Sequence, residues 1–251
     1  MDIKSGGKNM TEIILDENII RRIVRAIDKA IADDIPQYLQ EHHKETNNAI
    51  IQLRGDYINE NLRSFVVTDE VKLIPFKRYS WQGRLLADHR NKITYSVTTQ
   101  NNLHAIPKKK DRTRPHFLQS VLAQENGNYE GQYVQESLFP MEMFDEETLE
   151  NDYNDIIAGM LNPSEGYRHY VISYNAVNGE LLDVKLEFLD KHFSTIAEAS
   201  LNSYINPDFA RLTNSEVDNL DVKTDSNENV RDILGIKAGL RPELKEIEKE
   251  A

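Results

Sequence analysis

The chain contains no cysteine. This absence excludes disulfide bonds, thiolate metal sites and cysteine nucleophiles, and it fits a cytosolic protein. No apolar run approaches the roughly 18 residues that can cross a bilayer. Residues 1–8 are polar and lack the apolar core of a signal peptide. We therefore expect a cytoplasmic protein that does not enter a membrane.

Familiar motifs for nucleotides, metals and nucleophilic catalysis are also missing. The sequence has no phosphate-binding glycine loop, no dinucleotide fingerprint and no serine-hydrolase elbow. Its seven histidines show none of the spacings that place two imidazoles on one face of a helix. We therefore predict no cofactor, no metal site and no catalytic residue of these common kinds.

Charge is distributed unevenly along the chain. Residues 71–116 contain eleven Lys or Arg against two acidic residues, a net of +9 in a protein of formal charge −12. Residues 117–167 contain eleven Asp or Glu and no Lys or Arg. The overall charge argues against indiscriminate binding of polyanions. A local basic patch can still act, because the screening length at physiological salt is only about 8 Å.

The spacing of apolar residues predicts an α+β fold. Asp16 can cap a helix whose isoleucines recur at helical spacing. From Val71 the period changes to two, which predicts an antiparallel meander over residues 71–98 with its first turn at Gln82-Gly83. Asn178-Gly179 between apolar runs predicts a hairpin over residues 167–189. We expect an antiparallel sheet built from the meander and the hairpin, covered by helices on one face.

The remaining segments complete the expected organisation. Residues 116–124, 145–160 and 193–205 are each predicted to be helical. Residues 1–10 are interpreted as a leader and residues 206–251 as an acidic linker with a C-terminal helical tail. Between them, residues 11–205 are expected to form a single α+β domain, with a helical part (11–66) and a part of sheet and helices (67–205).

The basic segment is the main candidate for a binding site, because cations that alternate with aromatic residues are typical of sheets that bind nucleic acids. Two other interpretations remain open. The segment could dock on the acidic helix of Glu142–Asp155, in the same chain or in a second copy, or its cations could simply be solvated. The candidate binding residues are Lys77, Arg78, Trp81, Arg84, Arg90, Lys92, Lys108, Lys109, Lys110, Arg112 and Arg114.

Asp183 and Lys185 form the one local pattern that suggests catalysis. Metal-dependent nucleases use an acid-x-lysine pair on a strand, where the carboxylate holds Mg²⁺ and the lysine positions the water. The same spacing arises by chance on the solvated face of a hairpin strand. The pair is therefore a weak candidate for a catalytic site.

Three stretches carry a resemblance to a known family: Leu53–Leu62 (LRGDYINENL), Lys77–Trp81 (KRYSW) and His116–Gln119 (HFLQ). Together they resemble a family of uncharacterised proteins from Gram-positive bacteria and their prophages, over residues 11–205 and without the tail. The resemblance implies no catalytic residues. It implies a mobile-element setting, in which regulators and host-defence or anti-defence factors are common.

These observations favour a non-enzymatic intracellular binding protein that acts through a polarised basic and acidic surface on a macromolecular partner. The partner is expected to be another protein or a second copy of this chain. The first alternative is a nucleic-acid-binding protein that uses the basic and aromatic sheet face. A metal-dependent nuclease is the second.

Overall fold

The computed structural model describes residues 4–5, 15–43, 45–109, 111–130 and 144–205. The chain divides into two units, residues 1–206 and residues 207–251. The expected linker and tail, residues 206–251, lie outside the described residues. Most of the expected leader lies outside them as well. The first unit therefore provides the observations on the fold.

The N-terminal helices form as the isoleucine spacing predicts. Helix α1 (Glu17–Lys29) begins at Asp16, whose Oδ1 accepts the backbone N–H of Asn18 at 2.8 Å. Its isoleucines are buried in one core cluster. A π-helical turn (Ala30–Asp34) leads into α2 (Ile35–Glu41), and α3 (Ile50–Phe65) packs beside α1. Asn61 of α3 ties these helices together by donating to the carbonyl of Ala26 and the carboxylate of Asp34.

Within the described residues seven strands form one sheet, in the order β1-β7-β6-β5-β4-β3-β2. The α+β class is confirmed, but the sheet is mixed, because β4 and β5 are parallel whereas all other neighbours are antiparallel. Parallel neighbours need a long crossover, and here residues 100–167 supply it with three helices. The strands are β1 (Lys4–Ser5), β2 (Val71–Arg78), β3 (Trp81–Asp88), β4 (Ile93–Thr99), β5 (Arg168–Val177), β6 (Glu180–Leu189) and β7 (Thr195–Ser200).

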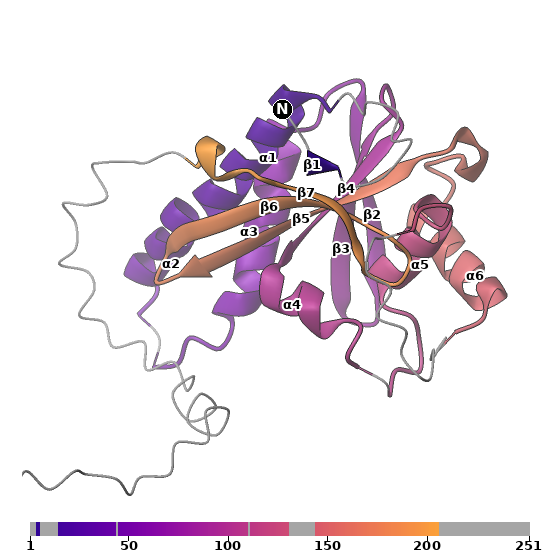
Figure 1. The fold of residues 1–251 in the computed structure, drawn as a ribbon. Helices are drawn as coiled ribbons and strands as arrows, with labels where there is room; N and C mark the ends of the chain where they lie inside the picture. The colour runs from indigo at the N-terminus through magenta and orange to yellow at the C-terminus, as the bar shows by residue number, and fades with distance from the viewer. Residues whose placement is uncertain (1–3, 6–14, 44, 110, 131–143, 206–251) are drawn as a thin grey trace, which may run out of the picture. The chain divides into compact units, whose positions relative to one another are not determined.

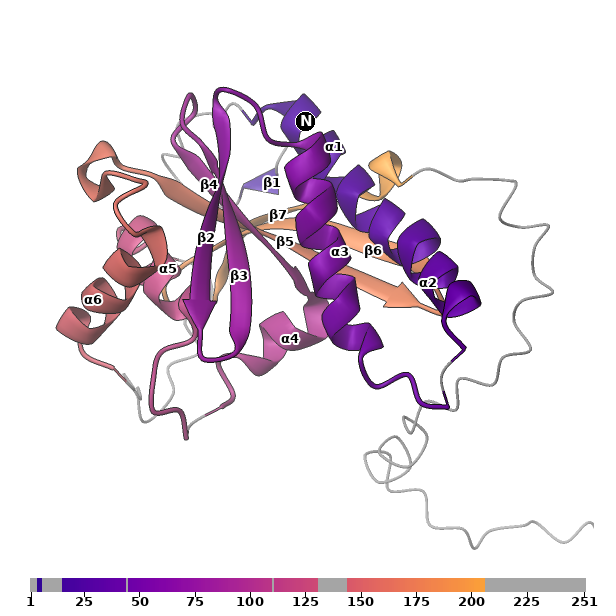
Figure 2. The same ribbon diagram turned by 180° about the vertical axis from the view of Figure 1, so that it is seen from behind.

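Helices cover both faces of the sheet, not one face as expected (Figures 1 and 2). One core cluster joins α1 and α3 to residues such as Leu86 and Ile172. Their neighbours in sequence, Leu85 and Val171, belong to a second cluster with α5 (Phe117–Glu125) and α6 (Glu146–Ile157). Successive strand residues point to opposite faces, so both faces of these strands are apolar and need cover. The short helix α4 (Gln100–Ala105) begins the crossover.

Two local predictions are corrected by the structure. The first turn of the meander lies at Tyr79-Ser80, and Gln82 and Gly83 already belong to β3. Residues 195–200, expected to be helical, form strand β7, because pairing with β6 overrides their weak helical pattern. The Asn178-Gly179 turn is confirmed, with φ values of 51° and 79°. Among the helices of the described residues, none is long and apolar enough to cross a bilayer.

Candidate functional site

The tip of the β2–β3 hairpin carries two exposed aromatic side chains. Tyr79 lies in the turn and is 77% exposed, and Trp81 follows the turn and is 51% exposed. Tyr79 has a φ of 53°, in the left-handed region that bulky residues rarely occupy. Such strain costs of order 1 kcal/mol or more, and it is found most often in binding sites and switches. The exposed rings therefore mark this turn as a candidate binding element.

Trp81 is held in place by the start of α5. Its ring stacks on Phe117 with centroids 5.7 Å apart, and it meets Phe76 edge-on at 5.6 Å. Gly83 lies beneath these rings, where a Cβ atom would collide with Phe76 and Trp81. Phe117 follows His116, which caps α5 through a reciprocal hydrogen-bond pair with Gln119. Trp81 therefore presents one fixed half-exposed ring beside a helix N-terminus.

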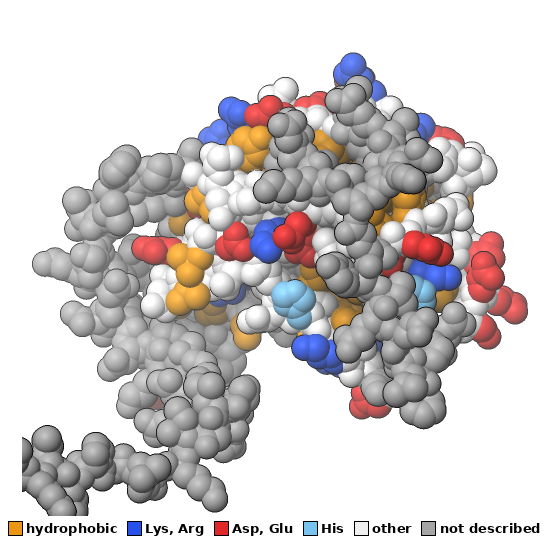
Figure 3. All heavy atoms as spheres, viewed as in Figure 1, with side chains coloured by type: hydrophobic (Ala, Val, Ile, Leu, Met, Phe, Trp, Pro, Cys, Tyr) orange, Lys and Arg blue, Asp and Glu red, His pale blue; other side chains and the backbone are white. Residues whose placement is uncertain are grey.

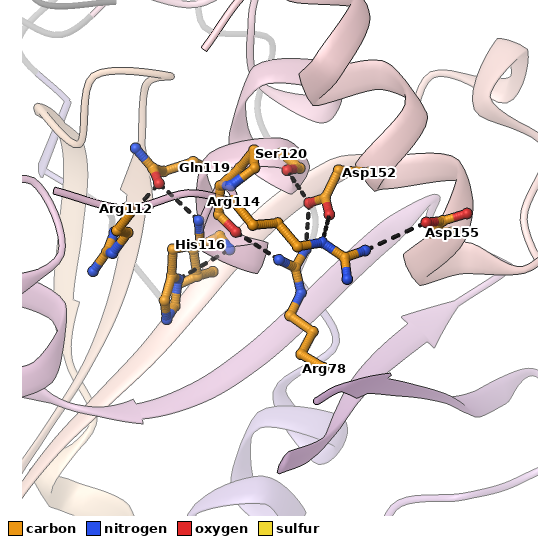
Figure 4. Close-up of polar contacts among 10 residues, drawn as sticks. Arg78, Arg112, Arg114, His116, Gln119, Ser120, Asp152 and Asp155 are labelled. Atoms are coloured by element: carbon orange, nitrogen blue, oxygen red, sulfur yellow. Dashed lines mark hydrogen bonds and ion pairs between the residues drawn. The ribbon is translucent and has the colours of Figure 1, made fainter. Parts of the chain in front are cut away.

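Two arginines of the basic segment converge on Asp152 of α6 (Figure 4). Arg78 and Asp152 form an ion pair in which both side chains are largely buried, at 10% and 4% exposure. Arg114 Nε lies 2.8 Å from Asp152 Oδ1, and its Nη2 lies 3.3 Å from Asp155 Oδ2. Ser120 also donates to Asp152, and Arg78 donates to the carbonyl of Pro115 at 2.5 Å. These five contacts fasten α6 to the hairpin and to α5.

Burial and neighbouring cations shift the pKa values of three basic groups in and beside this cluster. Burial lowers the pKa of Arg78, and the hydrogen bond and charge of Asp152 oppose that change. Burial lowers the pKa of His116 to about 3, and the charges of Arg112, Arg78 and Lys109 lower it further. His116 is therefore neutral at physiological pH, and three cations lie close enough to influence it. Burial also lowers the pKa of Arg112, whose Nη1 donates to Gln119 at 3.3 Å.

The predicted binding residues do not form a single surface. The register places Lys77 and Arg84 on the face of the hairpin opposite Trp81, since Trp81 shares its face with Phe76 and Leu85. Of the candidate cations on β2 and β3, only Arg78 shares the face of Trp81, and there it is paired with Asp152. Tyr95 is fully buried. The early turn at Tyr79-Ser80 accounts for this difference, because it fixes which residues pair across the hairpin.

The other predicted cations have separate surroundings. Arg90 and Lys92 lie beyond the opposite end of β3, where they pair with Glu70 and Glu165. Lys108 lines a separate cavity with His104 and Glu187. Lys110 lies outside the described residues. At the start of α5, Trp81 packs on Phe117, and Lys109 and Arg112 lie close enough to His116 to lower its pKa. We call Trp81, Lys109 and Arg112, together with the exposed Tyr79 of the adjoining turn, the tip surface.

Charge also alternates across the neighbouring surface. Acidic side chains gather over α6, beside the basic residues that border it (Figure 3). No carboxylate of the described residues forms an ion pair with Lys109 or Arg112 of the tip surface. Asp155 has a 75% exposed side chain although it pairs with Arg114. Lys109 and Arg112 therefore form no ion pair among the described residues, although the charge of Asp111 acts on Arg112.

Asp183 and Lys185 share one face of β6, as their spacing requires, but other polar groups hold them. Asp183 accepts hydrogen bonds from Gln100 at 2.7 Å and from Asn202 at 2.9 Å. Burial by itself raises the pKa of Asp183. The hydrogen bonds from Gln100 and Asn202 lower it by more, so the net shift is downward. Lys185 pairs with Glu198 at 3.4 Å. In the described part of the chain, no group of three or more His, Asp or Glu side chains could hold a metal ion.

The sequence interpretation missed Asp152, although a signal was present. Leu149, Asp152, Tyr153 and Ile156 follow the spacing of a buried helical stripe. An acidic residue within such a stripe needs a buried partner, because an unpaired buried charge is costly. Arg78 and Arg114 are those partners. Docking on the acidic helix, which the sequence left as one interpretation, thus occurs within this chain for two of the predicted cations.

Fold and surface together define an α+β protein with helices on both faces of a mixed sheet and an exposed aromatic hairpin tip. The chain belongs to DUF5986, a family of unknown function, whose model matches residues 13–251. The match includes residues 206–251, which the resemblance in the sequence had left outside. No curated protein and no solved structure matches the chain.

Proposed function

We propose that this is a non-enzymatic binding protein of the cytoplasm, which holds an acidic segment of a protein partner on the tip surface. The observation that carries the proposal is the fixed, half-exposed Trp81 ring at the start of α5, where Lys109 and Arg112 also act on His116 and form no ion pair among the described residues. Aromatic rings and arginine are enriched in the buried centres of protein interfaces. A partner could bury the ring and supply the missing carboxylates.

The neighbouring acidic surface of α6 favours a protein partner over a polyphosphate. Two of the cations nearest to α6 already bind its carboxylates. A long phosphate chain that crossed from the tip surface to α6 would meet exposed Glu146, Glu147 and Glu150. A protein can present both signs of charge, so it can match a surface on which both signs lie side by side.

A nucleic acid is the second candidate partner, and the exposed Trp81 and Tyr79 rings favour it. Stacking of a base on an aromatic side chain contributes about 1–3 kcal/mol per base. Single strands would bind better than duplexes, because their bases are free to stack. Binding to a nucleic acid should weaken steeply as salt rises, since each neutralised phosphate releases counterions.

The fluorescence of Trp81, the only tryptophan in the chain, tests both candidates directly. The protein is titrated with a polyglutamate peptide, a single-stranded oligonucleotide and the corresponding duplex, each at two salt concentrations. Quenching by the peptide supports the protein partner, and stronger quenching by the single strand supports the nucleic acid. If none of the three ligands changes the fluorescence, both candidates fail.

Matched variants identify the surface in the same titration. Lys109→Ala with Arg112→Ala removes both cations of the tip surface and should weaken binding at least fivefold. Arg90→Ala removes an exposed cation at the opposite end of β3 and should leave binding unchanged. Equal losses in the two variants would show that net charge, and not the tip surface, governs the binding.

Self-association is the form of this proposal in which the partner is a second copy. The tip surface of one copy would then meet the acidic side chains of α6 in another. In sedimentation equilibrium the mass should exceed 29.0 kDa at low salt and fall towards that value as salt screens the contact. A constant monomer at low salt would exclude this form and leave a different protein as the partner.

A role of this binding in regulation, host defence or anti-defence on a mobile element is part of the same proposal. It rests on the family resemblance of the sequence, and the geometry of the site does not bear on it. Expression of the protein in a bacterial host challenged with phage would test it. An unchanged plaquing efficiency with and without the protein would count against a defence role.

A further inference from the structure

A cavity of about 270 Å³ lies between the end of α4 and the β6–β7 turn. Leu103 and Leu189 on its wall are buried in the second core cluster, and Phe193 packs against that cluster. Together with Pro107 they give the cavity an apolar wall. None of the described lining residues belongs to the tip surface. The cavity is therefore a separate candidate site.

The β6–β7 turn holds Phe193 at this wall in a strained conformation. Phe193 has a φ of 66°, in the left-handed region that bulky residues rarely adopt. The carboxylate of Asp190 accepts the backbone N–H groups of His192 and Ser194, each at 2.8 Å. The N–H of Phe193 donates to the carbonyl of Asp190 at 3.0 Å. Strain of this kind is concentrated in binding sites, where the surrounding structure enforces it.

Glu187 of β6 supplies a carboxylate to the cavity. The Ser173 hydroxyl donates to its Oε1. No described residue donates to its Oε2, and Oε2 is not one of the buried polar atoms that lack a partner. Oε2 is therefore open to the cavity. Burial raises the pKa of Glu187, and the Ser173 hydrogen bond opposes that change.

Two basic side chains line the same cavity from α4 and the segment after it. His104 and Lys108 are both exposed, and the charge of His104 acts on Glu187, so these side chains lie near one another. Lys108 forms no ion pair with any described residue. The nearby Lys185 and Glu198 pair with each other at 3.4 Å and do not line the cavity. The cavity thus combines an apolar wall with charged groups of both signs.

We propose that this cavity binds a free α-amino acid with an apolar side chain. Its ammonium group would contact Glu187 Oε2, its carboxylate would contact Lys108 and His104, and its side chain would cover the apolar wall. Small-molecule sites typically have such a wall and a few polar groups that fix orientation. The volume corresponds to about nine water molecules at the density of the liquid, and so to about nine non-hydrogen atoms. Leucine has this size.

Four ligands of the same size test each part of the proposal: L-leucine, L-leucinamide, 2-hydroxy-4-methylpentanoate and L-asparagine. Leucinamide lacks the carboxylate, the hydroxy acid lacks the ammonium group, and asparagine lacks the apolar side chain. Binding to the full chain is followed by saturation-transfer NMR at pH 7, where leucinamide is mostly protonated. Leucine should bind at least tenfold more tightly than each of the others. A smaller preference over any of them, or no binding of leucine at millimolar concentrations, would overturn the proposal.

A matched pair of glutamate variants tests the ammonium contact. Glu187→Gln keeps the size of the side chain but removes its charge, and should lower the affinity for leucine at least tenfold. Glu198→Gln removes a carboxylate from the position opposite Glu187 on β7, outside the cavity, and should change the affinity less than twofold. Unchanged affinity in Glu187→Gln would overturn the proposal.

A matched pair of lysine variants tests the carboxylate contact and decides the matter if Glu187→Gln does not fold. Lys108→Ala removes an exposed cation of the wall and should lower the affinity for leucine at least fivefold, with little change for leucinamide. Lys191→Ala removes an exposed cation of the β6–β7 turn that does not line the cavity, and should have no effect. If both lysine variants lose affinity equally, overall charge governs the binding and the proposal fails.

Discussion

The carboxylates of Asp152 and Glu125 are both nearly buried, yet their surroundings differ sharply. Asp152 has two arginine partners and a hydroxyl donor, so its charge is compensated within the fold. Glu125 has two hydroxyl donors and no arginine or lysine partner in the described residues. In the first site, charge fastens α6 to the hairpin. In the second, a carboxyl group is buried among neutral donors, and burial raises its pKa.

The difference shows how one helix can serve two purposes. Helix α6 contributes Asp152 to the ion-pair cluster and the adjacent Tyr153 to the Glu125 network. The cluster fixes where α6 lies, and this placement sets the Tyr153 hydroxyl against Glu125. The cluster thus holds α6 through charged groups, whereas the Glu125 network holds it through neutral hydroxyl donors.

Removal of Asp152 should have the largest effect. Asp152→Ala leaves Arg78 buried without its partner, and breaking a buried pair in this way costs about 3–5 kcal/mol. Urea unfolding followed by circular dichroism would measure the loss. A loss below 1 kcal/mol would show that Arg78 reaches solvent in the variant and that the cluster does not fasten α6.

Replacement of Glu125 should change how stability depends on pH. Because the pKa of Glu125 is raised to about 7 in the folded state, its protonated form stabilises the fold. That contribution is present below about pH 4.5 and is lost as pH rises through 7. Between pH 5 and pH 8 the wild type should lose roughly 2–3 kcal/mol relative to Glu125→Gln. His169 is present in both proteins, so its titration on the acid side cancels; parallel pH curves would contradict the burial of this carboxyl group.

Removal of one hydroxyl donor should lower the free energy of unfolding more beside Glu125 than beside Asp152. Tyr153→Phe removes one of two donors to a buried carboxylate without a cation, and should cost about 1.5–3 kcal/mol at pH 8. Ser120→Ala leaves Asp152 with both arginines and should cost about 0.5–1.5 kcal/mol. Chemical denaturation of both variants provides the measurement. The reverse order would show that the cluster depends on its hydroxyl more than on its arginines.

The ion pair of Arg114 with the exposed Asp155 should contribute least to stability. Asp155 has a 75% exposed side chain, so Asp155→Ala should cost less than about 1 kcal/mol. The small loss should disappear at high salt, whereas the loss in Asp152→Ala should persist. Thermal unfolding at low and high salt would compare the two variants, and equal salt dependence would show that Asp152 is as well solvated as Asp155.

Local features of the fold could be predicted because they depend on residues close in sequence. Asp16 caps α1 and Asp145 caps α6 through their own side chains. Asn178 and Gly179 adopt the positive φ values that a two-residue hairpin turn requires. The turn at Tyr79-Ser80 could not be predicted in this way, because it places at its first position a tyrosine, which rarely adopts a positive φ.

The candidate sites could be predicted only in part. Charge along the sequence identified the basic segment and the acidic helix, and even their possible contact. The charge pattern could not show that Arg78 and Arg114 form ion pairs with Asp152 whereas Lys109 and Arg112 form none among the described residues. That choice depends on how the hairpin, α5 and α6 pack against one another. Glu125 gave no signal, since a single acidic residue at the end of a helix is normally solvated.

The amino-acid sequence by itself determined the α+β class, the amphipathic isoleucine helix and the separation of charge into a basic and an acidic segment. These properties follow from periodicity and composition, which act over a few residues. Tertiary structure alone decided the parallel pairing of β4 with β5, the second helical layer and the burial of Glu125. Each of these depends on contacts between residues far apart in the chain, whose energies become favourable only when the whole sheet and its helices pack together.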